Sequence, residues 1–265
     1  PAISLFARAL VVTGSLRSGS QNRAGTIKLT GEDAVSIQDA TIAANGPDGG
    51  EVQIISMNGT VSLVNSVVQT NLEATGQTQG GTILVGNDAK NGTLPFSLST
   101  TIDQFSSMNT QALLSNGVGG FIETSGHFLS QLASINAGRG GMWLLDPDDV
   151  VIDATTAASI STALSANTDV TITTTSSTPN CVGVSCTPTS SGSGSIYVSS
   201  AINATGAGSL TLSPYSSGAI YLSANISTGG SQIYSGNVYI RGDISLTTSN
   251  GSLSVSGNVV YQSMI

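Results

Sequence analysis

The sequence has few charged, aromatic or cysteine residues and no long apolar run. Only 8% of its 265 residues are charged and 5% are aromatic, and the formal net charge is -8. Nucleic-acid binding needs clustered Lys and Arg, and the seven such residues here form no cluster. No wholly apolar stretch exceeds about six residues, far below the roughly 20 that a helix needs to cross a bilayer. We therefore expect no nucleic-acid partner and no transmembrane helix.

The only two cysteines, Cys181 and Cys186, lie in one polar segment, Asn-Cys-Val-Gly-Val-Ser-Cys. They are too few for a zinc site of their own and close enough to bridge. A local disulfide fits an oxidising compartment, with two free thiols in a cytosolic loop as the alternative. Pro1 follows no initiator Met or apolar leader, so we expect that a signal peptide has been removed and that the chain is a piece of a longer protein.

Glycine, serine and threonine are abundant, with 32, 42 and 30 residues, yet 39% of the chain is apolar and the mean hydropathy is +0.21. Such a chain is apolar enough to fold. Short runs that alternate β-branched and polar residues, bounded by Gly, Asn and Asp, predict strands. These runs are 26–29, 34–37, 51–55, 60–64, 82–85, 121–122, 142–145, 169–173, 195–198, 209–212, 219–222, 237–240 and 252–255.

Gly-Gly pairs precede four of these runs, at 49–50, 80–81, 119–120 and 140–141. Irregular repeats of one strand phrase, read in one direction, favour a parallel solenoid over a sandwich. Three Asn-Gly pairs followed by Thr or Ser, at Asn58, Asn91 and Asn250, could nevertheless form hairpins. We predict an all-β, right-handed parallel β-helix with apolar residues inside, Gly, Asn and Asp at the corners, and Ser and Thr outside. About 22 residues per coil would give on the order of a dozen coils.

One segment departs from the strand pattern. Ile160 and Leu164 are spaced as i and i+4 in an Ala-rich run that begins with Thr, which predicts one short helix at about 156–166. We divide the chain accordingly into coils over 1–154, an insertion of helix, strand and Cys181–Cys186 loop over 155–195, and further coils over 196–265. The segment 1–154 includes a first stretch that could cap the stack or contact another subunit.

Residues 119–154 contain two phrases that point to a family. Gly-Gly-Phe-Ile-Glu-Thr-Ser-Gly spans 119–126, and Gly-Met-Trp-Leu-Leu-Asp-Pro spans 141–147. This region closely resembles the end of the long β-helix in filamentous-haemagglutinin-like exoproteins of two-partner secretion systems. The resemblance extends over most of the chain and is strongest from Gly119 to Val259. The amino-terminal secretion domain of that family is not found in the sequence.

The resemblance implies a secreted protein on the outer bacterial cell surface, exported through a β-barrel transporter of the outer membrane. It also implies a rod that acts in adhesion, aggregation or biofilm formation. Some members of the family carry a closely spaced cysteine pair, which favours a disulfide between Cys181 and Cys186. We expect host-cell, glycan or matrix surfaces, or copies of the chain itself, as partners, and no cofactor.

The best cluster of chemically active side chains is Asp146, Asp148 and Asp149, with Asp153 close behind. Asp-Pro-Asp-Asp is first of all a turn sequence. A calcium site formed by these carboxylates is the less favoured interpretation. His127 is the only histidine, so any Ser-His-Asp triad would include it. We predict a solvent-facing corner for His127, near Glu123, and we predict that Trp143 is packed beneath a loop or the helix.

Three functions follow from these observations, and the first is an adhesive or scaffolding rod without catalytic residues. The second is a subunit of an extracellular filament or sheath, because the run from Ala2 to Val12 is the most hydrophobic in the chain. Its candidate assembly residues are Ile3, Leu5, Phe6, Leu10, Val11 and Val12. The third is a β-helical enzyme that degrades polysaccharides, which we place last because no Arg or Lys follows the aspartates within a coil's length.

Overall fold

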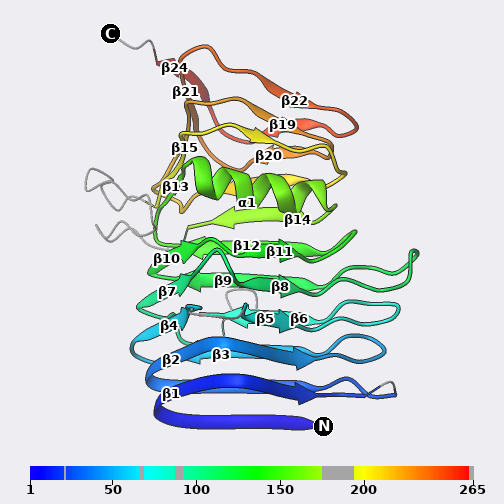
Figure 1. The fold of residues 1–265 in the computed structure, drawn as a ribbon. Coiled ribbons are helices and arrows are strands. Elements are labelled where there is room, and N and C mark those ends of the chain that lie inside the picture. The colour runs from blue at the N-terminus through cyan, green and yellow to red at the C-terminus, as the bar shows by residue number, and fades with distance from the viewer. Residues whose placement is uncertain (21, 66–68, 87–91, 93, 175–193, 263–265) are drawn as a thin grey trace.

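The chain forms a parallel, solenoid-like stack of strands with one helix (Figure 1). This is a computed structural model, which describes residues 1–265 except 21, 66–68, 87–91, 93, 175–193 and 263–265. Every named strand pair is parallel. The all-β, parallel prediction is confirmed, and each predicted strand overlaps an observed one.

Successive coils place their strands on three faces. The first face stacks β1 (Ala2–Ser18), β2 (Thr26–Ala44), β3 (Glu51–Ser56), β6 (Thr82–Val85), β9 (Phe121–Gly126), β12 (Met142–Pro147), β14 (Asp169–Thr173), β17 (Leu210–Ser213), β20 (Gln232–Tyr234) and β23 (Leu253–Val255). The second face has β4 (Thr60–Leu63), β7 (Ser99–Ile102) and β10 (Phe128–Gln131), then β13 (Val150–Ile152), β15 (Ile196–Val198), β18 (Ile220–Leu222), β21 (Val238–Arg241) and β24 (Val259–Gln262). The third face has β5 (Asn71–Glu73), β8 (Ser107–Asn109), β11 (Ser134–Asn136), α1 (Ala154–Ser165), β16 (Ile202–Asn203), β19 (Ile226–Thr228) and β22 (Leu246–Thr248). The long strands β1 and β2 run over all three faces, because successive parts of β2 pair with β3, β4 and β5.

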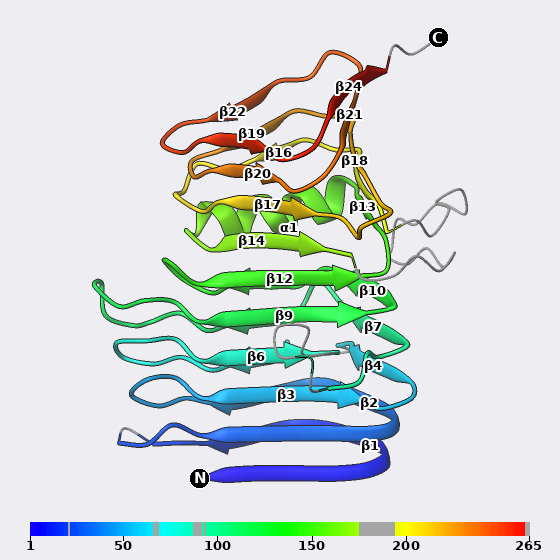
Figure 2. The same cartoon turned by 180° about the vertical axis from the view of Figure 1, so that it is seen from behind.

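The first face is continuous from one end of the stack to the other (Figure 2). Strand side chains alternate between the two sides of a sheet, so every second residue points into the stack. One such row of register partners is fully buried over seven strands and consists of Ile27, Val52, Ile83, Ile122, Trp143, Val170 and Leu210. Burial of these side chains fixes the register, because a slip by one residue would turn the whole row outward.

The predicted Gly-Gly corners lie one above another. Gly50, Gly81, Gly120 and Gly141 immediately precede β3, β6, β9 and β12 on the first face. A Cβ atom at Gly81 would overlap the carbonyl oxygen of Gly50 below it, and a Cβ atom at Gly120 would overlap that of Gly81. Glycine is therefore required there because the backbones of neighbouring coils approach too closely for any side chain.

The predicted helix is confirmed at Ala154–Ser165, two residues earlier than expected. It begins there because the Asp153 carboxylate accepts the backbone N–H of Thr156 at 2.9 Å, the usual N-cap bond. Ala157, Ile160, Ala163 and Leu164 face the interior and are buried. The helix contacts β11 on one side and β16 on the other. It thus occupies the position of a strand on the third face.

The repeat length is less uniform than predicted. The last coils keep a spacing near the expected one, with first-face strands starting at Leu210, Gln232 and Leu253. Some earlier coils are longer, such as those from β3 to β6 and from β6 to β9, and their loops that lead back to the first face bond to each other. The N–H of Gln77 donates to the Pro47 carbonyl at 2.7 Å, and the N–H of Leu114 to that of Gln77 at 3.0 Å. The first-face stack contains ten strands rather than a dozen.

Candidate functional site

The acidic turn after β12 is built from three buried carboxylates, since Asp146, Asp148 and Asp149 are at most 1% exposed. Asp146 accepts the Thr173 hydroxyl at 3.0 Å, and Asp149 accepts the backbone N–H of Ser195 at 2.6 Å. Asp146 and Asp149 thereby bond the acidic segment to the coil that follows it. Among the residues that the structure describes, no group of three or more His, Cys, Asp or Glu could hold a metal ion. Calcium binding by this turn stays a prediction.

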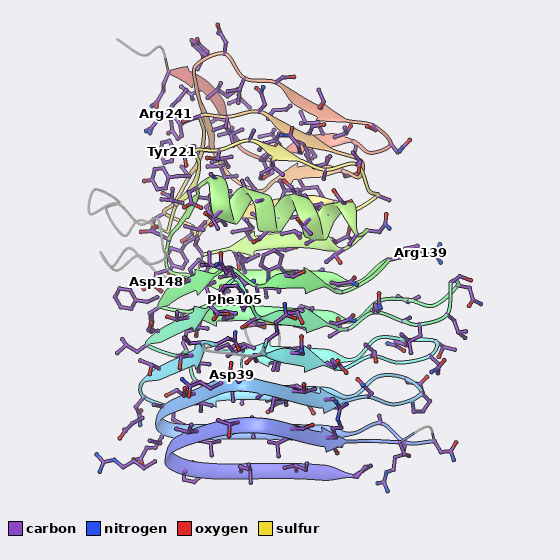
Figure 3. The ribbon with its side chains drawn as sticks, in the orientation of Figure 1. Asp39, Phe105, Arg139, Asp148, Tyr221 and Arg241 are labelled. Carbon is purple, nitrogen blue, oxygen red and sulfur yellow. The ribbon has the colours of Figure 1, made fainter. Side chains whose placement is uncertain are left out.

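The single histidine lies at a corner, as predicted, with 42% of its side chain exposed. Its partner is in the next coil rather than nearby in sequence. The Nδ1 atom of His127 lies 3.0 Å and 3.2 Å from the two carboxylate oxygens of Asp148. Asp148 is labelled in Figure 3. Glu123, the expected neighbour, is fully buried and accepts the Ser125 hydroxyl at 2.7 Å. The ring of Phe96 packs edge-on against the imidazole ring of His127, with 4.7 Å between the ring centres.

Trp143 is an interior residue with no exposed surface, so it offers no platform for a sugar. Its indole Nε1–H donates to the Thr124 hydroxyl at 3.0 Å. Thr124 stands in an interior row that is otherwise aliphatic at the neighbouring positions Val85 and Leu145. The threonine therefore satisfies a donor that would otherwise be buried without a partner.

The candidate assembly residues lie in β1, whose far edge has no partner strand in the described part of the chain. Phe6 and Val11 are each 66% exposed, and Leu5 is 37% exposed. Val12 is buried, and Ile3 and Leu10 are partly buried and pack against the core. The predicted set is thus divided between residues that face solvent and residues that belong to the first coil's interior.

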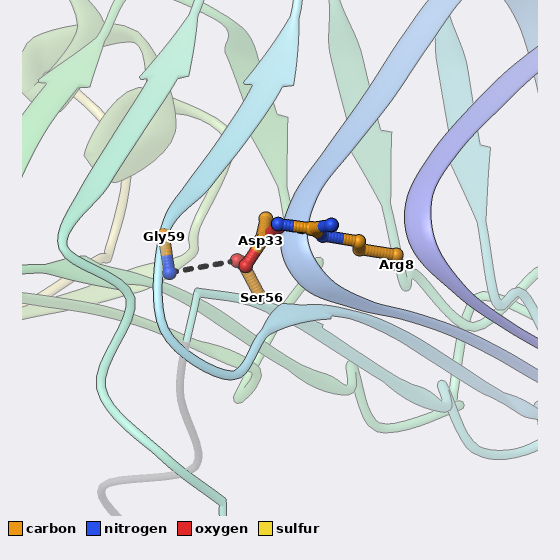
Figure 4. A network of polar contacts seen from close by, with 4 residues as sticks. All are labelled: Arg8, Asp33, Ser56 and Gly59. Carbon is orange, nitrogen blue, oxygen red and sulfur yellow. Dashed lines mark hydrogen bonds and ion pairs between the residues drawn. The ribbon is translucent and has the colours of Figure 1, made fainter.

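A surface ion pair lies between β1 and β2 (Figure 4). The Arg8 Nε–H donates to the Asp33 carboxylate at 2.7 Å, and this bond together with the negative charge raises the pKa of Arg8 above its ordinary value. Both side chains are largely exposed, so solvent screens the attraction. In the same corner region, the Ser56 hydroxyl accepts the Gly59 N–H at 3.1 Å.

A column of tyrosines on the second face was not predicted from the sequence. The rings of Tyr197 and Tyr221 stack at 4.8 Å, and those of Tyr221 and Tyr239 at 5.1 Å. The Arg241 guanidinium lies 4.3 Å from the centre of the Tyr221 ring, and both residues are marked in Figure 3. Burial is the main cause that raises the pKa of Tyr221. Each tyrosine is the middle residue of an apolar-Tyr-apolar triplet, a signal that could have revealed the column.

A polar cluster fills the interior near the end of the stack. Gln232 and Tyr234 follow Leu210 and Leu212 in the two interior rows and are at most 1% exposed. The Tyr234 hydroxyl donates to Gln232 Oε1 at 2.7 Å, and Gln232 Nε2 donates to the Thr247 carbonyl at 2.7 Å. Burial raises the pKa of Tyr234 above its ordinary value. These bonds pair the polar atoms, so the cluster joins the first face to the third.

Two open grooves follow the outer surface. One, of about 480 Å³, runs between stacked loops and is lined by residues including Arg17, Asn45, Gln77 and Leu113. The other, of about 770 Å³, crosses β6, β9 and β12 over Gly81, Gly120, Phe121 and Met142. Enclosed pockets suit small molecules, whereas open grooves of this kind suit extended partners.

Cys181 and Cys186 lie outside the described residues. In the part of the chain that the structure describes, no helix is long and apolar enough to span a membrane. Comparisons of the chain with protein-family models, with curated proteins and with solved structures found no match.

Proposed function

We propose that the chain is a section of a secreted bacterial surface adhesin, a right-handed parallel β-helix that forms a rod and mediates attachment to surfaces or in biofilms. The observation that carries the proposal is the uninterrupted first face, whose ten strands keep two interior rows in register. A parallel stack that buries a continuous core is an extended, rod-like spacer. Its outer surface offers open grooves that suit an extended partner.

The two phrases that resemble filamentous-haemagglutinin-like exoproteins support this proposal because they form one structural unit. Ile122 pairs with Trp143, Thr124 with Leu145 and Gly126 with Pro147 in adjacent strands. The Trp143 indole also donates to the hydroxyl of Thr124 across the two phrases. The residues of the two phrases thus contact each other and stabilise one pair of neighbouring coils.

The partners that we propose follow from the same resemblance. A β-barrel transporter of the outer membrane would export the chain, and the rod would then contact host-cell, glycan or matrix surfaces. The low charge and the abundance of serine and threonine suit a folded surface rod. A disulfide between Cys181 and Cys186 belongs to this proposal, since the extracellular space is oxidising.

An attachment assay tests the adhesin proposal. Beads coated with the chain should bind epithelial cells or matrix, and an excess of soluble chain should compete. A variant with Ile122→Asp, which places a charge in the interior, should neither bind nor compete, while Gln53→Ser on the outside of the stack controls for the substitution itself. Equal attachment of coated and uncoated beads would contradict the proposal. Release of reducing sugars that Asp149→Ala abolishes would replace it with an enzymatic function.

Self-assembly into a filament is a second candidate, favoured by Phe6 and Val11 of β1, which are each 66% exposed. Exposed apolar side chains are common in contacts between subunits. Negative-stain microscopy at micromolar concentration should then show ordered fibres, and these should disappear in a Phe6→Ser, Val11→Ser variant. Thr13→Ser is the matched control. Monomeric rods in both variants and in the unchanged chain would contradict filament formation.

A further inference from the structure

The hydrogen-bonded stack is interrupted at the same level on two of its three faces. On the second face, β10 pairs only with β7 and β13 only with β15. No backbone hydrogen bond joins these two strands, both of which the structure describes completely. On the third face, α1 stands between β11 and β16. Only the first face continues through this level, from β9 through β12 and β14 to β17.

The interruption on the second face contains a crevice and one polar bridge. The crevice, of about 20 Å³, is lined by residues that include Leu129 and Gln131 of β10 and Val150 of β13. Gln131 is 5% exposed, and its Oε1 atom has no hydrogen-bond partner among the residues that the structure describes. The bridge is the contact of His127 with Asp148, which joins the corner before β10 to the turn before β13. Packing is therefore incomplete where the backbone ladder is absent.

The helix is held unequally on its two sides. Towards the C-terminal coils, Ser161 Oγ accepts the N–H of Asn203 at 3.0 Å and Ser165 Oγ accepts the N–H of Thr205 at 3.3 Å. Towards the preceding coil, the bonds are made just after the helix, where the Thr168 hydroxyl accepts the N–H groups of Ala137 at 3.0 Å and of Gly138 at 3.2 Å. Between α1 and β11 themselves, the contacts are apolar and not directional. The helix itself is thus hydrogen-bonded to the coil that follows it, whereas its link to the preceding coil runs through Thr168.

We propose that the coil of β12, β13 and α1 is a joint at which the rod bends. The first face acts as the hinge because its ladder is continuous, while the second face, where no ladder joins β10 to β13, opens and closes. The contact between His127 and Asp148 is the latch on the second face. In Figure 1 the strands of the last coils, such as β19 and β22, are inclined to those of the first coils. The joint is a property of the fold and does not depend on the adhesin proposal.

Spin-label distance measurements on the full chain, with Cys181→Ser and Cys186→Ser, test the joint. Labels at Thr101 and Ser223 span the second face across the joint. Labels at Gln53 and Thr211 span the first face, and labels at Thr60 and Ser130 stay within the N-terminal coils. We expect the distance distribution of the second-face pair to be about twofold wider than that of either other pair. A second-face distribution no wider than the first-face one would overturn the joint.

The latch is tested with two substitutions at the same position. His127→Ala removes the bridge and should widen the second-face distribution further. His127→Asn keeps a side-chain donor near the position of Nδ1 and should preserve the original width. Circular dichroism confirms that each variant is folded, which is expected because His127 is partly exposed. Equal widths in the two variants would overturn the assignment of the latch.

Discussion

On the second face, β2, β4, β7 and β10 carry hydroxyl side chains outward, whereas β15, β18 and β21 carry tyrosines. The hydroxyl row consists of Ser36, Ser62, Thr101 and Ser130, and the aromatic row of Tyr197, Tyr221 and Tyr239. Each row follows the register of its own set of parallel strands. In the interior, the N-terminal coils are aliphatic around β3 and β6, whereas the C-terminal coils contain the polar residues Gln232 and Tyr234. The repeat thus fixes the backbone, and different side chains stabilise it in each region.

The largest effect is expected in the interior near the joint. Trp143→Ala should lower the free energy of unfolding by about 3–5 kcal/mol, because it leaves a cavity and an unsatisfied Thr124 hydroxyl. Met142→Ala is the matched control, since Met142 is 41% exposed and should change stability far less. Denaturant unfolding measures both. Equal losses would mean that the row containing Trp143 does not form the core.

The polar interior of the C-terminal coils should be nearly as sensitive. Gln232→Ala removes the partner of Tyr234 and several bonds across the stack, so we expect a loss of about 1–3 kcal/mol. Gln262→Ala near the end of β24 controls for the loss of an amide from an accessible site. If Gln232→Ala is harmless, the buried cluster does not hold the first and third faces together.

Alkaline pH should weaken the C-terminal coils through Tyr234. Its folded-state pKa is raised, so the unfolded chain loses this proton first and gains stability relative to the folded one. The contribution of Tyr234 is complete below the ordinary tyrosine pKa of about 10 and decreases as the pH rises above it. The free energy of unfolding is measured below and above that pH for the unchanged chain and for the Tyr234→Phe variant. It should decrease less in the variant, which lacks the ionisable hydroxyl. The same decrease in both would contradict the burial of this phenol.

The outward rows should show the smallest effects and the clearest contrast. Tyr221→Ala interrupts two ring stacks and the contact with Arg241, so we expect a loss of about 1 kcal/mol. Ser62→Ala at the equivalent outward position of the N-terminal coils should stay within about 0.5 kcal/mol. Thermal unfolding of the two variants makes the comparison. A reversed order would show that the hydroxyl row, rather than the tyrosine column, stabilises the outer surface.

The sequence predicted strands where β-branched and polar residues alternate over a recognisable run, as in β2, β3 and β14. It did not predict β5, β8 or β11, each of which has only one buried apolar side chain, Leu72, Met108 and Ile135. Other short strands, among them β7, β10, β13 and β20, were not predicted either. The helix was predictable from the spacing of Ile160 and Leu164. Contacts between coils were not, because loops of unequal length separate the partners in sequence.

The separation of contacting residues in sequence also explains which contacts of the candidate site could not be predicted. His127 was placed near Glu123, its neighbour in the chain, but it contacts Asp148 of the following coil. The three tyrosines of the second face likewise meet only when their coils are stacked in register. Asp148 and Asp149 lie in the bend between β12 and β13, as predicted, whereas Asp146 belongs to β12. Their burial and their separate partners follow from the next coil.

Disulfide formation between engineered cysteines tests most directly whether parallel coils are stacked in this register. In a variant with Cys181→Ser and Cys186→Ser, the pairs Ser36→Cys with Ser62→Cys and Ser62→Cys with Thr101→Cys replace register partners. Adjacent strands lie about 4.8 Å apart, within reach of a disulfide, so both pairs should oxidise readily. The pair Ser36→Cys with Thr101→Cys, two strands apart, should not. Failure of both adjacent pairs, or ready oxidation of the distant one, would contradict the stacked-coil structure.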